Sequence, residues 1–108
     1  MKKIFLAMVI VLLSCSLTYA AYRYESITIA DTAIGLTAAN IKVNTVRVYC
    51  TLETAQIRFR TDGTNPTAST GHLLETGAAL ELYSYDDISK FKAIRTGATS
   101  GALQCSYW

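Results

Sequence analysis

The sequence is poor in the residues from which catalytic and metal-binding sites are built. It contains a single histidine, His72, and no nucleophile motif accompanies it. Because His72 directly follows Gly71 at the end of a polar loop, we interpret it as a loop residue rather than a general base. The cysteines and this histidine show no close ligand spacing, so they do not predict a metal site. The sequence therefore predicts a protein that is not an enzyme and that needs no cofactor.

Carboxylates arranged for chemistry are scarce as well. Asp86 and Asp87 are adjacent, and side chains of adjacent residues generally point apart. Capping of a short helical turn at residues 84–88, with Ser84 as the cap, accounts for them more simply. Asp62 stands alone, whereas a calcium loop gathers several carboxylates. It begins a segment, residues 62–67, whose Asp-Gly and Asn-Pro pairs predict a turn.

The chain has little excess charge. Ten basic and eight acidic residues give a net charge of +2. Lys2 and Lys3 lie at the extreme N-terminus, and without them the count is 10 − 2 = 8 basic against 8 acidic residues. The remaining chain is neutral, so its charge gives no reason to expect binding to nucleic acid.

One uninterrupted apolar run occurs near the start, at residues 4–13. It is too short to cross roughly 30 Å of hydrocarbon as a helix. Together with Lys2 and Lys3 before it and Ala20 after it, the run has the order of a bacterial-type signal peptide. We therefore predict a signal helix and signal peptide at residues 1–20 and a single domain at residues 21–108, exported to the periplasm or the cell exterior.

A second processing scheme stays open. Residues 12–15, Leu-Leu-Ser-Cys, resemble a lipobox, in which Cys15 would carry lipid. The domain would then be a membrane-anchored lipoprotein. Contact with a membrane is expected only in this case.

Cys50 and Cys105 remain as a pair under either scheme. Two cysteines in an exported domain are expected to form a disulfide. The bridge would close a loop of 105 − 50 = 55 residues. The chain-entropy model gives such a loop roughly 4 kcal/mol of stabilisation.

After the leader, short runs of alternating apolar and polar residues predict strands. Residues 45–53 place Val46, Val48, Cys50 and Leu52 on one face, and residues 56–61 repeat the alternation. Because only two residues separate these runs, they predict a hairpin.

Further strands are predicted at residues 78–83, 90–95 and 102–107, with shorter candidates at 26–30 and 33–37. Six or seven short strands separated by turns predict an all-β fold, a small antiparallel sandwich of immunoglobulin-like or jelly-roll-like type. Cys50 and Cys105 both fall on apolar faces, so we expect their bridge in the core.

The outward residues allow two interpretations: a solvated face whose basic residues are balanced by Glu53, Glu75 and Glu81, which the neutral charge of the domain favours, or a surface for interaction. Arg47, Arg58 and Arg60 form a basic stripe on the predicted hairpin, Tyr49 lies between them in sequence, and Trp108 ends the chain. As an interaction surface it suits an anionic surface or a protein partner. Self-association is expected separately, because exposed edges of a sandwich pair readily. Aromatic side chains on a β surface also stack on sugars, so a polysaccharide ligand is the alternative.

Two family resemblances follow from longer motifs. Residues 57–67, IRFRTDGTNPT, resemble a strand and turn of the immunoglobulin-like domain at the C-terminus of chitobiase-type glycosidases. That domain is an accessory module without catalytic residues, so the resemblance implies none here.

The second resemblance covers more of the chain. Residues 57–67, 71–82 and 91–97 are similar to small phage and prophage proteins, which implies a sandwich with a structural or virion role. The leader and the cysteine pair depart from that pattern. We therefore predict an exported, non-catalytic structural or interaction protein, able to self-assemble or to join a larger surface or virion-like assembly. The alternative is a carbohydrate-binding accessory module.

Overall fold

The computed structural model describes residues 20–108, so the predicted signal helix and Cys15 lie outside the described residues. Along the chain the elements are β1 (Arg23–Ile29), η1 (Ala38–Asn40), β2 (Val48–Glu53), β3 (Ile57–Arg60), β4 (His72–Leu74), β5 (Ala79–Leu82), α2 (Tyr85–Lys90), β6 (Lys92–Arg95) and β7 (Gly101–Tyr107). No helix in residues 20–108 has the length and hydrophobicity needed to cross a membrane.

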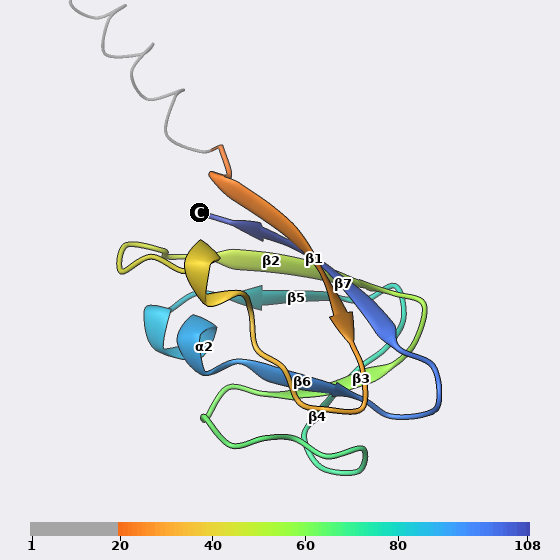
Figure 1. Cartoon of the computed structure of the whole chain (residues 1–108). Coiled ribbons are helices and arrows are strands. Elements are labelled where there is room, and N and C mark those ends of the chain that lie inside the picture. Colours follow the sequence, from red (N-terminus) through yellow and green to blue (C-terminus); the bar gives the residue numbers. More distant parts are fainter. Residues whose placement is uncertain (1–19) are drawn as a thin grey trace, which may run out of the picture.

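The strands form two antiparallel sheets that face each other (Figure 1). A four-stranded sheet has the order β1-β7-β2-β5, and a three-stranded sheet has the order β4-β3-β6. The predicted all-β sandwich is confirmed. The division into four and three strands matches an immunoglobulin constant-type domain, but in that domain the last strand belongs to the smaller sheet. Here β7 lies between β1 and β2 in the larger one.

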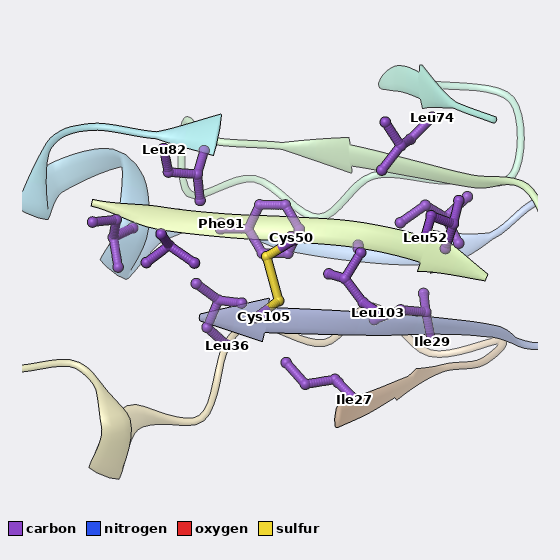
Figure 2. Close-up of a cluster of buried hydrophobic side chains, with 14 of the residues drawn as sticks. Ile27, Ile29, Leu36, Cys50, Leu52, Leu74, Leu82, Phe91, Leu103 and Cys105 are labelled. Carbon is purple, nitrogen blue, oxygen red and sulfur yellow. A yellow bond between two sulfur atoms is a disulfide. The ribbon is translucent and has the colours of Figure 1, made fainter. Parts of the chain in front are cut away.

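The core fills the space between the sheets, and β7 contributes most regularly to it. Gly101, Leu103, Cys105 and Tyr107 alternate inward along β7, and all four are buried. Side chains from β1, β2, β5 and β6 meet them in one hydrophobic cluster (Figure 2). Strict alternation of this kind is what half-buried strands require, because successive side chains point to opposite faces.

The disulfide is confirmed within this core. Cys50 of β2 pairs directly with Cys105 of β7, their Cα atoms are 4.2 Å apart, and both side chains are fully buried. The bridge joins neighbouring strands of one sheet (Figure 2). It therefore fixes the register of the last strand against β2.

A polar pair closes one end of the core, formed by the buried Tyr107 and the half-buried Glu25. The Tyr107 hydroxyl donates a hydrogen bond to the Glu25 carboxylate. Burial raises the pKa of Tyr107, and Glu25 raises it further. Burial also raises the pKa of Glu25, but hydrogen bonds from Thr37 and Tyr107 outweigh this effect and leave the pKa lowered. Tyr107 therefore stays neutral while Glu25 stays ionised.

The predicted hairpin between residues 45–53 and 56–61 is wrong. β2 belongs to the four-stranded sheet and β3 to the three-stranded sheet, so the short connection carries the chain from one layer to the other. Thr54 in this connection has a positive φ of 78°. Leu52 before it and Ile57 after it both point into the same core. Two successive strands bury alternate residues whether they pair in one sheet as a hairpin or lie in opposite sheets. The alternating pattern therefore could not distinguish these two arrangements.

Three strand boundaries also differ from the prediction. Val46 was expected inside, but it lies before β2 and is exposed, because a turn at residues 42–45 precedes the strand. Residues 33–37 form only a bridge from Ile34 to Ala93. β4 (His72–Leu74) was not predicted, since it holds only three residues.

The helical turn is confirmed. Ser84 caps α2, its hydroxyl accepting a hydrogen bond from the backbone N–H of Asp87 at 3.1 Å. The helix continues to Lys90, so β6 begins two residues later than the strand predicted from residue 90.

Candidate interaction surface

The predicted surface residues divide between the two sheets. Tyr49 lies on β2, Arg47 directly precedes that strand, and Trp108 directly follows β7, the neighbour of β2. Arg58 and Arg60 lie on β3 in the other sheet. The basic stripe expected on one hairpin therefore does not exist as one surface, because its two halves occupy different layers.

Arg47 and Trp108 form a compact pair on the larger sheet. The Arg47 guanidinium carbon lies 4.7 Å from the centre of the Trp108 ring, a cation–π arrangement. Arg47 Nη2 donates to the Glu81 carboxylate at 3.0 Å. The backbone N–H of Trp108 donates to the Arg47 carbonyl oxygen at 2.8 Å. The terminal indole is therefore held against the sheet by main-chain and side-chain contacts.

Strand register brings more aromatic residues onto the same outer face. Tyr24 of β1 lies opposite Ser106 of β7, and Ser106 lies opposite Tyr49 of β2. Tyr83 directly follows β5, on which Glu81 lies opposite Tyr49. Diagonal neighbours on one face of a sheet are about 7–8 Å apart. We call this cluster the aromatic face; its members are Tyr24, Tyr49, Tyr83 and Trp108.

The aromatic face is accessible. Tyr24 is 62% exposed and Tyr83 66% exposed, whereas Tyr49 and Trp108 are half-buried. Tyr24 and Tyr83 were not predicted as surface residues from the sequence. Their outward positions follow from strand alternation, but only the order β1-β7-β2-β5 places them beside Tyr49 and Trp108.

A polar row borders the aromatic face. The Tyr24 hydroxyl donates a hydrogen bond to the Gln104 side-chain oxygen. Gln104 in turn donates through Nε2 to the Glu53 carboxylate at 3.5 Å. The outer face therefore offers rings for stacking next to amide and carboxylate groups for hydrogen bonding.

The two arginines of β3 hold a loop instead. Arg58 donates to the backbone carbonyl oxygens of Ala68 and Gly71, at 3.1 and 2.8 Å. Arg60 donates through Nε to the Asp62 carboxylate at 3.0 Å. These contacts fasten residues 61–71 to the sheet, so both guanidinium groups serve the fold.

The Arg60–Asp62 pair gives a pH-dependent prediction. Hydrogen bonds from Arg60 and from the Thr64 backbone N–H lower the pKa of Asp62 to about 2. Asp62 is therefore ionised and paired with Arg60 above the ordinary pKa of an aspartate, and this ion pair is lost as the pH falls towards 2. We expect the Asp62 carboxyl to titrate near pH 2 by NMR, and we expect Arg60→Met to raise that midpoint.

Arg58→Met is the matched control, because Arg58 bonds carbonyl oxygens and not Asp62. It should leave the midpoint unchanged. An Asp62 midpoint that stays near pH 2 in the Arg60 variant would show that another group lowers the pKa.

His72 lies in a hollow of about 310 Å³ beside this loop, lined also by Arg60, Thr61, Asp62, Thr70 and Gly71. Its ring packs against Phe59 with centroids 5.4 Å apart. Among residues 20–108, no three His, Cys, Asp or Glu side chains gather closely enough to hold a metal ion. The hollow is therefore lined by His72, by the threonines Thr61 and Thr70, and by the Arg60–Asp62 ion pair.

Comparison with known proteins gives no further assignment. No protein-family model, curated protein or solved structure matched the chain. The resemblances to phage proteins and to the chitobiase-type module stay predictions from the sequence.

Proposed function

We propose that this chain is an exported, non-catalytic interaction protein that binds a protein partner, or a second copy of itself, through the aromatic face. The clustering of Tyr24, Tyr49, Tyr83 and Trp108 on one outer face of the larger sheet carries the proposal. Aromatic residues and arginine are enriched where proteins bind each other, and the pair of Arg47 and Trp108 combines both.

Arg47 is held in an unusual state beneath this face. Its Nε is buried and has no hydrogen-bond partner, the one such side-chain atom found in residues 20–108. A buried donor without an acceptor is costly. The cost is tolerated beside the Trp108 ring and the Glu81 carboxylate, which Arg47 contacts through the rest of its guanidinium group.

Self-association can be tested directly. We expect light scattering with size-exclusion chromatography to show a molar mass that rises with protein concentration. A variant with Tyr49→Ala and Trp108→Ala should elute as a monomer, because it removes the two half-buried rings of the face. Leu73→Ala is the matched control, because Leu73 is an exposed aliphatic residue on the other sheet. A wild-type chain that is monomeric at every concentration would contradict self-association.

A polysaccharide ligand is the second candidate, favoured by the row of polar groups beside the rings. Tyr24, Gln104 and Glu53 form a connected hydrogen-bonding row along the sheet. Sugars combine apolar faces that stack on rings with hydroxyls that bond such groups. Co-sedimentation with chitin, cellulose and peptidoglycan tests this candidate. Retention that the Tyr49→Ala, Trp108→Ala variant loses would support it, and no retention on any of them would remove it.

A further inference from the structure

A second hollow lies on the side of the sandwich where β1 and β6 are the edge strands of the two sheets. The segment 30–41 crosses this side on its way from β1 to η1 (Figure 1). It is joined to β6 by two main-chain hydrogen bonds between Ile34 and Ala93, at 2.9 and 2.8 Å. Next to this bridge a hollow of about 430 Å³ opens between residues 34–41 and residues 85–92. We call it the side hollow.

The side hollow has a mainly apolar lining. Leu36 and Phe91 are buried members of the core cluster and form its floor (Figure 2), and Ile41 packs against the same cluster. Ile34 and Tyr85 line its rim, where they stay 43% and 48% exposed. Binding sites for small molecules are hollows of about 300–1,000 Å³ with linings of this kind. The size and the lining therefore fit a small apolar molecule.

Gly35 brings the segment close to β6 beside the side hollow. A Cβ atom on residue 35 would lie 2.9 Å from the Phe91 carbonyl oxygen, which is too close for any side chain. The Lys92 Cδ atom is 3.9 Å from the same point, so the stem of Lys92 passes over Gly35. Glycine is therefore required for this close approach, and it leaves room for the Lys92 side chain along the wall of the hollow.

Lys92 is the one charged residue that lines the side hollow. It is half-buried and lies directly opposite Arg60 of β3. Like charges in opposite positions on neighbouring strands are unfavourable. Asp62 pairs with Arg60, whereas no acidic group within residues 20–108 forms an ion pair with Lys92. A negative group bound in the hollow would supply the partner that Lys92 lacks in this part of the chain.

We propose that the side hollow binds a small alkyl carboxylate, with the alkyl chain against Leu36 and Phe91 and the carboxylate beside Lys92. Apolar burial and charge pairing then favour the same molecule, because the apolar floor and the cationic wall belong to one hollow. This ligand site is separate from the proposed partner-binding surface, because no residue of the aromatic face lines it.

Hexanoate and hexanol are suitable probes, because they have the same number of carbon atoms and differ in the charge of the head group. Each is titrated into the isotope-labelled protein and followed by NMR, in about 0.15 M salt so that distant charges are screened. We expect hexanoate to shift the backbone amide signals of residues 34–41 and 85–92, which surround the hollow.

Lys92→Met should weaken hexanoate binding about fivefold, the value of an ion pair at a partly exposed site. It should not weaken hexanol binding, because methionine keeps an unbranched apolar stem. Lys90→Met is the matched control, since Lys90 is bonded to Asp86 and does not line the hollow. It should leave the affinities for both probes unchanged.

Ser89→Phe should abolish binding of both probes, because the larger side chain on α2 would fill the hollow. Serine and phenylalanine have similar helix propensities, so we expect α2 to be kept. The amide spectrum of each variant checks that the sandwich is intact, and Lys92→Met decides the proposal if Ser89→Phe does not fold.

Three outcomes would overturn the proposal: hexanoate shifts no signals around the hollow, Lys92→Met weakens both probes equally, or folded Ser89→Phe binds hexanoate like the wild type. The variant with Tyr49→Ala and Trp108→Ala should bind hexanoate as the wild type does. Failure of the side hollow as a ligand site is therefore distinguishable from failure of the aromatic face as a partner surface.

Discussion

Replacing Cys50 and Cys105 together by alanine should lower the free energy of unfolding by roughly 4 kcal/mol. The bridge closes a loop of 55 residues. Removing the bridge raises the conformational entropy of the unfolded chain, which stabilises the unfolded state relative to the folded one. For a domain of this size the loss corresponds to a fall in Tm of roughly 15–30 °C. Thermal unfolding followed by circular dichroism measures it.

Reductant gives the control for this experiment. The wild type should lose a similar amount of stability under reducing conditions, whereas the double alanine variant should not respond to reductant. A double variant that unfolds within a few degrees of the wild type would show that register and packing alone hold β7 against β2.

Phe91→Ala should destabilise the domain by about 3–5 kcal/mol, the usual cost of deleting a buried aromatic ring. Phe91 is buried at the junction of α2 and β6, and its ring stacks on Phe59 at 5.8 Å between centroids. The cavity would open between the helix and the core, where the short α2 has little freedom to close it. Chemical denaturation gives the difference in the free energy of unfolding.

Phe59→Ala is the matched control, because the same kind of ring is only partly buried there. We expect a smaller loss of stability for Phe59→Ala. Equal losses at both positions would indicate that the contact between the rings, rather than the burial of Phe91, carries the stability.

The fold was largely predictable because alternation is a local property. The inward residues of β7 and the Ser84 cap of α2 both depend on short stretches of sequence, which can be recognised directly. The order of the strands in the sheets depends on residues far apart and could not be recognised in this way. Whether the residues after Glu53 return along the same sheet or cross to the other depends on packing with distant strands, and the short connection allowed either.

The candidate surface was half predictable for the same reason. Arg47, Tyr49 and Trp108 were expected together and lie together. Arg58 and Arg60 were placed with them only through the incorrect hairpin. Tyr24 joins the aromatic face because β1, the first strand, pairs with β7, the last one. Strands so far apart in the sequence share no short motif that would predict their pairing.

The central position of β7 has a consequence for the order in which the domain can form. β1 and β2 are not hydrogen-bonded to each other. Each of them pairs with β7, which follows both in the sequence. Synthesis from the N-terminus, or threading in that direction through a narrow channel, therefore delivers both outer partners before the strand that joins them. The larger sheet can therefore close only after β7 has followed β1 and β2, so these two strands wait for a partner that lies far along the chain.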